Sequence, residues 1–360
     1  MNNGFMRYYK RERVTAECEI LTPMFLGGPD QSAQWRAAPF KALLRKWWRV
    51  AHGQGLKHDE LYQKESELFG AAGEKGSDLG KSRVIVSLWA DAKSSEERMP
   101  NVPKVNQPEC QRNNGDVSPL LYLAGMGLMA PNGNVKHSYF KPGEKFQLTI
   151  EAGKDDIEKL KPVLRLIQAF GTIGGRSRNA WGSFSFKIGD EFLAEPKFES
   201  WEKGFERDYP ALLGRDDAGA LIWKTVPSQK DDKNKWESAM TVLADTYIAV
   251  RARSLSVKGK TLDKLNPGEG SANERHLLGI PLTNHAAFDK KARHASPLHF
   301  KVVKLGNSYH GVILHLPHKH SDQQPILDKN KTKQIEVWKK VHQKLDAISS
   351  IQRATMAELR

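Results

Sequence analysis

The stretch KFQLTIEAGKDDIEKLKPVLRLIQAFGTIGGRSRNAWGSFSFKIG, residues 145–189, carries the clearest succession of secondary-structure signals in the chain. Apolar and polar residues alternate at its start, which predicts a strand, and the segment that follows has helical period. A glycine-rich segment comes next, and WGSFSFKIG predicts a further strand. The stretch therefore predicts a strand, a helix, a loop and a strand in that order.

The glycine loop, which we define as residues 170–186 (FGTIGGRSRNAWGSFSF), admits two interpretations. It holds four glycines and two arginines. Glycines let main-chain N–H groups approach a ligand closely, and arginines add fixed positive charge, so the loop would suit an anion such as a phosphate. The alternative is a helix C-cap followed by a tight turn with solvated arginines. We expect Trp181, at the start of the last strand, to pack in the core.

Upstream segments complete the same unit. RVTAECEI (13–20) alternates as a strand, PFKALLRKWWRVAHG (39–53) has helical period, and SRVIVSLWA (82–90) predicts another strand. The polar stretch 91–118 predicts a long loop. The order βαβ…βαβ is that of a ferredoxin-like domain, so the fold class is α+β.

The second half repeats this architecture in a degenerate form. We expect an amphipathic helix over 232–254, and strands and a closing helix over 219–228, 276–283, 296–306, 309–317 and 332–359. The irregular stretch 190–218 suits a connection between domains. The sequence therefore predicts two tandem ferredoxin-like domains, residues 1–190 with the glycine loop and residues 191–360 with a long terminal helix.

The charge balance favours a polyanionic partner. The chain has 360 residues, with 56 Lys and Arg against 42 Asp and Glu, a net charge of +14. Its two cysteines, Cys18 and Cys110, form no CxxC motif, which indicates a reducing compartment, and we expect a cytoplasmic protein. No apolar run is long enough to span a bilayer, and membrane attachment is the least favoured partner class.

The helix over 39–53 would present a basic face. On a helical wheel, five residues share one side, opposite the apolar residues: Lys41, Arg45, Trp48, Arg49 and His52. This face could contact nucleic-acid phosphates and stack a base on Trp48. The alternative is a solvated helix face with a partly buried tryptophan.

Motifs for catalysis, metals and cofactors are weak or absent. GSDLGKS (76–82) is one residue short of a phosphate-binding P-loop and leads into a strand, so we reject a nucleotide-triphosphate site there. The run HGVILHLPHKH (310–320) holds four histidines without a carboxylate or cysteine at ligand spacing, and we expect surface histidines and no metal. No nucleophile or zinc-protease motif occurs, and we expect no cofactor. Two basic pairs, Arg275-His276 and Arg293-His294, are either phosphate contacts or ordinary loop residues.

Five motifs together resemble a known family. They resemble, in the same order along the chain, motifs of the RAMP-type first subunit of the Cmr effector complex of type III-B CRISPR systems. The motifs are TPMFLGG, PFKALLRKWWR, ELFG, GGRSRNAWGSF and HLLG followed by RHASPL. The resemblance covers about residues 14–316. It implies two fused ferredoxin-like domains, guide RNA, target RNA and other RAMP subunits as partners, and a place near the guide 3′ end without nuclease activity.

The resemblance and the basic segments define the expected RNA-binding residues. They are Lys41, Arg45, Trp48, Arg49, Gly174, Gly175, Arg176, Ser177, Arg178, Asn179, Arg293 and His294. Arginines would grip phosphate oxygens, and Gly174 and Gly175 would let main-chain N–H groups donate to them. No catalytic residue is expected.

Two other function classes stay open. One is a metal-independent endoribonuclease that processes guide RNA, with His52 or His294 as the general base on a ribose 2′-hydroxyl. The other is a scaffold that binds only proteins. Cleavage of repeat RNA in the presence of a chelator would favour the nuclease.

Overall fold

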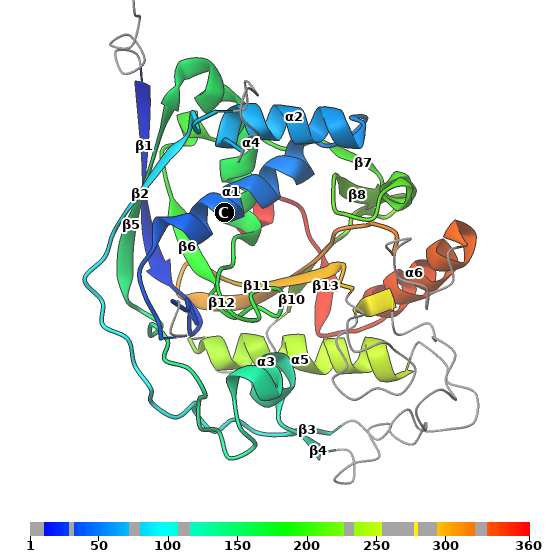
Figure 1. Cartoon of the computed structure of the whole chain (residues 1–360). Coiled ribbons are helices and arrows are strands. Elements are labelled where there is room, and N and C mark those ends of the chain that lie inside the picture. The colour runs from blue at the N-terminus through cyan, green and yellow to red at the C-terminus, as the bar shows by residue number, and fades with distance from the viewer. Residues whose placement is uncertain are drawn as a thin grey trace, which may run out of the picture.

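The computed structural model of the chain describes residues 11–28, 32–71, 80–106, 116–226, 234–253, 277–279, 294–320 and 330–360. Helices and antiparallel sheets share the core, which confirms the expected α+β class. Figure 1 shows one sheet standing at the left, a second sheet crossing the middle, and helices α3 and α5 beneath the second sheet.

The first half forms a βαββαβ unit. Its strands and main helices are β1 (Arg11–Ile20), α1 (Ala37–His52), β2 (Ile85–Trp89), β5 (Lys145–Gly153), α4 (Lys154–Phe170) and β6 (Phe184–Lys187). The sheet order is β2-β5-β1-β6, and every neighbouring pair is antiparallel. Numbered within the unit, this is the order 2-3-1-4, which agrees with the ferredoxin-like arrangement that the sequence predicts.

Two additions extend the first unit. Helix α2 (His58–Phe69) follows α1 and packs against it. The excursion between β2 and β5 carries a short antiparallel pair, β3 (Val105–Asn106) with β4 (Asp116–Val117), and then α3 (Pro119–Leu128). Helix α3 packs on α5 of the second half, so this excursion links the two halves.

The second half is a more complete unit than the sequence predicts. Its elements are β10 (Ile222–Thr225), α5 (Trp236–Arg253), β11 (Leu298–Leu305), β12 (Ser308–His315), α6 (Lys331–Asp346) and β13 (Ile351–Arg353), in the antiparallel sheet order β11-β12-β10-β13. The connection before it contains β7 (Phe198–Ser200), β8 (Leu213–Asp216) and β9 (Gly219–Ala220), with short helical turns at Asp190–Phe192 and Trp201–Glu206.

Two of the expected elements differ. The closing helix ends at Asp346, and the chain then forms β13 and a final turn at Ala357–Leu359. The strand expected over 276–283 has no counterpart in its described part, because Leu277 and Leu278 form a helical turn. The hairpin of β11 and β12 is confirmed.

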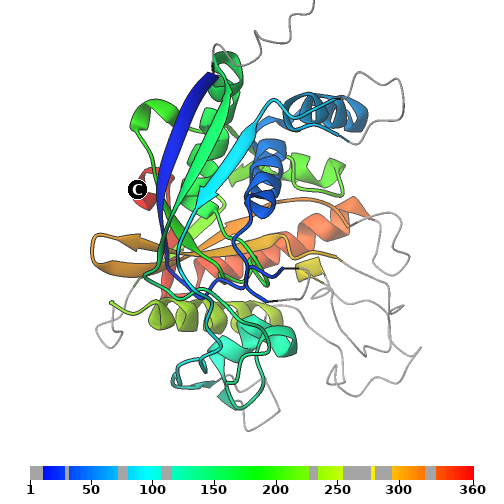
Figure 2. The same cartoon turned by 60° about the vertical axis from the view of Figure 1, so that its left-hand side comes forward.

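The helices of the first unit lie between the two sheets. Alternate residues of β11 face opposite ways: the His299 ring lies 2.7 Å from the carbonyl oxygen of Phe170 at the end of α4, whereas the Phe300 ring packs edge-on against Tyr247 of α5. The layers are therefore sheet, α1 with α4, sheet, and α5 with α6 (Figures 1 and 2). The division into domains at residues 190 and 191 stays a proposal, since the halves share buried contacts throughout.

Candidate nucleic-acid interface

Glycines shape the loop at points of close main-chain contact. Gly174 has a φ of 95°, and a Cβ atom on it would lie 2.5 Å from the carbonyl oxygen of Phe25. Gly182 has a φ of 65°, and its Cβ would lie 1.8 Å from the carbonyl oxygen of Ile173. The N–H of Gly175 donates to the Phe25 carbonyl oxygen at 2.8 Å. This N–H is therefore not available to a phosphate, contrary to our expectation. These glycines serve the packing of the loop.

Arg178 and Asn179 anchor the loop to its surroundings. The Arg178 guanidinium donates to the main-chain oxygen of Ser296 at 2.7 Å, and the Arg178 carbonyl oxygen accepts from the N–H of Phe300 at 2.8 Å. The Asn179 side-chain amide donates to the carbonyl oxygen of Leu123 in α3 at 2.8 Å. The loop is therefore held by both β11 and α3.

Arg176 is the loop residue that faces solvent. Its main chain has a φ of 55°, and its side chain is exposed. The guanidinium lies over α3, with one nitrogen 3.0 Å from the place of a Cβ on Gly125, where the helix is kinked by a φ of 63°. No ion pair joins Arg176 to another described residue. Ser177 beside it is half-buried.

Lys46 is a cation that the sequence analysis missed. It lies on α1, and its Nζ is 3.4 Å from Nδ1 of His299 and 4.7 Å from the ring centre of Trp47. Burial, together with the charge of Arg178, lowers the pKa of Lys46 to about 7, and burial also lowers the pKa of Arg178. No carboxylate among the described residues contributes to either shift. Among the described residues, Lys46 and Arg178 are therefore two partly desolvated cations close enough for Arg178 to disfavour the charge of Lys46, with no carboxylate acting on either.

The expected basic face of α1 is largely engaged within the protein. Glu65 of α2, which is buried, accepts from Arg45 at 2.7 Å and from Arg49 at 2.8 Å. Burial alone would raise the pKa of Glu65, but the hydrogen bonds from Arg49 and Arg45 together with the charges of these arginines outweigh it and lower the pKa. Lys41 is half-buried, and burial with the neighbouring Arg45 lowers its pKa.

Trp48 corrects a specific expectation. Its side chain is only 5% exposed and packs edge-on against Phe69 of α2, so no base can stack on it in this structure. Trp181 is fully buried against Phe25 and Trp236, as expected for a core residue.

The histidines expected at the surface are mostly buried. His315, His318 and His320 are each at most 4% exposed, and His310 is half-buried. His294, expected to contact RNA, is 7% exposed, and its ring lies 4.7 Å from that of His320. These side chains fill the interior of the second half. Arg293, Arg275 and His276 lie outside the described residues.

His294 is held in the neutral form by its surroundings. Burial, together with His318 and His320, lowers the pKa of His294 to about 2. The Nδ1 of its neighbour His318 lies 2.8 Å from the carbonyl oxygen of Leu316, to which it can donate, and burial lowers the pKa of His318 to about 4.

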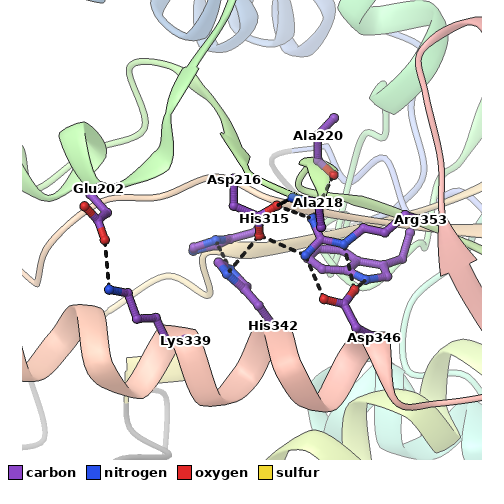
Figure 3. A network of polar contacts seen from close by, with 10 residues as sticks. Glu202, Asp216, Ala218, Ala220, His315, Lys339, His342, Asp346 and Arg353 are labelled. Atoms are coloured by element: carbon purple, nitrogen blue, oxygen red, sulfur yellow. Dashed lines mark hydrogen bonds and ion pairs between the residues drawn. The ribbon is translucent and has the colours of Figure 1, made fainter.

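A second histidine pair belongs to a buried polar network (Figure 3). The His342 Nε2 and His315 Nδ1 atoms are 2.9 Å apart, so one donates to the other. Next to them, Arg353 donates to both Asp346 and Asp216, and Trp223 donates to Asp346 at 2.7 Å. The network joins α6, β8, β10, β12 and β13, which indicates a structural role for these histidines.

In the described part of the chain, no group of three or more His, Cys, Asp or Glu side chains could hold a metal ion. Among the helices that the structure describes, none is both long and apolar enough to cross a membrane.

Sequence comparison finds a family likeness in the first unit. A model of the RAMP superfamily matches residues 17–185, which run from β1 into β6 and include the glycine loop. Residues 17–185 of this chain therefore resemble a RAMP superfamily domain.

Relatives of the whole chain extend this result. "CRISPR system Cmr subunit Cmr1-1" from Pyrococcus furiosus is 24% identical over 338 residues, which cover 86% of this chain and 87% of that protein. The crystal structure of apo Cmr1 from the same organism matches with a TM-score of 0.48 and 18% identity, over 89% of this chain and 91% of that one. A chain of the type III-B Cmr-β complex bound to cognate target RNA matches with a TM-score of 0.44 and 12% identity, over 92% of this chain and 99% of that one. The expected resemblance to the first Cmr subunit is confirmed.

Proposed function

We propose that the chain is a non-catalytic, RNA-binding subunit of a type III-B CRISPR effector complex. It would lie near the 3′ end of the guide RNA, assist target RNA engagement and contact other RAMP subunits in the cytoplasm. The similarity to Cmr1-1 over 86% of the chain and the net charge of +14 support this proposal.

One observation carries the RNA-binding part of the proposal: Lys46 lies 3.4 Å from His299, which contacts Thr172 of the glycine loop, and among the described residues the charge of Arg178 acts on Lys46 with no carboxylate to offset it. Desolvated like charges disfavour one another, and a phosphate placed between them would relieve the repulsion and favour protonation of Lys46. Exposed Arg176 would extend this contact along the backbone, since its planar fork suits phosphate oxygens.

The other expected contacts take a smaller part. Arg45 and Arg49 share the charge of Glu65, which leaves less charge for a phosphate. Gly174, Gly175 and Asn179 hold the loop in shape, and Lys41 and Ser177 would lie at the edge of the contact. Arg178 serves both the loop anchor and the phosphate.

The positions of the two candidate general bases, His294 and His52, disfavour the nuclease alternative. His294 is buried among other histidines, so a ribose in solvent cannot contact it. The Nε2 of His52 lies 2.8 Å from the carbonyl oxygen of Lys159, to which it donates in the neutral form, and burial lowers the pKa of His52.

A binding and cleavage assay with one RNA tests the proposal. A guide-type RNA labelled at its 5′ end is incubated with the purified chain in chelator and analysed on native and denaturing gels. We expect a shifted but intact RNA, weaker binding by Lys46→Gln, and unchanged binding by Lys154→Gln, an exposed lysine at the far end of α4. Specific cleavage, or equal binding by the two variants, would overturn the proposal.

A further inference from the structure

A pocket lies on the first unit where α1, α2 and α4 meet. It has a volume of about 380 Å³ and is lined by Trp48, His52, Leu56, Lys64, Glu67, Leu68, Arg83 and Lys159. Its volume is within the range of small-molecule sites.

The pocket is separate from the glycine loop. His52 contacts Lys159 near the start of α4, whereas the loop begins at the other end of that helix, after Phe170. Phe170 lies eleven positions beyond Lys159 on this helix, which is about 16 Å along the axis. A small ligand in the pocket would not touch Arg176 or Arg178.

The lining combines cations with an apolar floor. Lys64 is exposed and makes no ion pair with another described residue. Arg83 and Lys159 approach the same carboxylate, Asp156, at 2.8 Å and 3.7 Å. Arg83 and Lys159 therefore share one buried carboxylate, Lys64 adds a third cation, and Leu56 and Leu68 supply apolar surface.

One acceptor remains available in this lining. Glu67 is exposed, and its carboxylate accepts only from Gln63 of the same helix among the described residues. A ligand with acceptor oxygens for the cations, hydroxyl or amino donors for Glu67 and a flat apolar body for the floor would suit this lining.

We propose that this pocket binds a mononucleotide unit. Its phosphate would lie among Lys64, Arg83 and Lys159, its base would cover the apolar floor, and a ribose hydroxyl or base amino group would donate to Glu67. Inorganic phosphate alone would leave the floor and Glu67 unused. The unit is either a free nucleoside monophosphate or the phosphorylated end of an RNA, and the site holds whether or not the glycine loop binds RNA.

Calorimetric titration of the full chain with AMP tests the proposal. We expect AMP to bind with a Kd below about 1 mM, and adenosine and inorganic phosphate to bind more weakly. Lys64→Gln should weaken AMP binding about tenfold because a charged hydrogen bond is lost. Lys154→Gln, an exposed lysine of α4 outside the pocket, is the matched control and should bind AMP like the wild type.

Competition identifies the source of the nucleotide. A short RNA with a terminal phosphate that displaces AMP, while its hydroxyl-ended form does not, would assign the site to an RNA end; AMP binding without such competition would assign it to a free nucleotide. The proposal is wrong if neither ligand binds, or if Lys64→Gln and Lys154→Gln behave alike. Arg176→Ala should leave AMP binding unchanged, which separates this site from the glycine loop.

Discussion

The Arg178 guanidinium donates to the main-chain oxygen of Ser296 across 2.7 Å, and this contact joins the glycine loop of the first unit to the segment that leads into β11. The N–H of Phe300 donates back to the Arg178 carbonyl oxygen. A ligand that contacts the loop would therefore act on a segment that is hydrogen-bonded to the second half of the chain.

Replacing Arg178 should cost stability as well as charge. In Arg178→Ala, the carbonyl oxygen of Ser296 loses a charged donor, and we expect the free energy of unfolding to fall by about 1–3 kcal/mol. Urea unfolding followed by tryptophan fluorescence measures this change. Arg176→Ala removes the same charge from an exposed position and is the matched control. Equal unfolding midpoints for the two variants would show that the Ser296 contact does not stabilise the fold.

Gly182 should tolerate no side chain. Its positive φ and the position of the Ile173 carbonyl oxygen, 1.8 Å from a Cβ, predict a loss of about 3 kcal/mol or more in Gly182→Ala. Gly143 also has a positive φ, of 90°, but no atom lies within 4 Å of its Cβ position, so Gly143→Ala should cost only about 1–2 kcal/mol. Thermal unfolding of both variants separates the effect of the close contact at Gly182 from that of backbone strain alone at Gly143. A similar loss of stability in both variants would show that the close contact does not add to the strain.

The buried histidines should make the fold sensitive to acid. Burial, with Arg353 beside His342, lowers the pKa values of His318 and His342 to about 4. Because the unfolded chain takes up these protons first, near pH 6.5, stability is complete above that pH and is lost as the pH falls towards 4. Each histidine contributes on the order of 3 kcal/mol to this loss.

Urea unfolding at a series of pH values measures the acid sensitivity. His342→Gln removes one of the titrating groups, and its unfolding free energy should depend less steeply on pH than that of the wild type. An identical pH dependence in the two proteins would show that His342 is not held neutral in the fold.

Glu65 should stabilise the contact of α1 with α2. In Glu65→Gln, Arg45 and Arg49 lose their common carboxylate, and we expect a loss of about 2 kcal/mol because both arginines are partly exposed. Glu67→Gln, at an exposed position one half-turn further along α2, is the control and should change stability little. RNA affinity should not fall in Glu65→Gln, since the change adds net positive charge near α1; a marked loss would place Glu65 itself in the interface.

The hydrophobic pattern predicts most of the fold and little of the site. Alternation and helical period locate β1, α1, β5, α4 and β6, because each of these elements buries one face. The three residues of β13 are too few to show a period, so the helical pattern over 332–359 predicts one helix through this strand.

The sequence predicts less of the site than of the fold, because the exposure of a helix residue depends on which other elements pack over it. The helical wheel places Trp48 beside Arg45 and Arg49 correctly, but it cannot show that α2 lies over this face and supplies Phe69 and Glu65. Lys46 falls between the two sides of the wheel, so the sequence does not mark it as a candidate site residue. It becomes one only in the fold, where β11 places His299 beside it and the charge of Arg178 from the loop acts on it.

The salt dependence of RNA binding by Arg176→Ala tests the central claim most directly. The wild type, Arg176→Ala and Arg215→Ala, which removes an exposed arginine outside the glycine loop, are titrated with the same guide-type RNA at several salt concentrations. The account predicts that Arg176→Ala binds about tenfold more weakly, with a slope of log K against log salt that is shallower by about 0.7. Arg215→Ala should match the wild type. Equal affinity and equal slope for Arg176→Ala and the wild type would contradict the account.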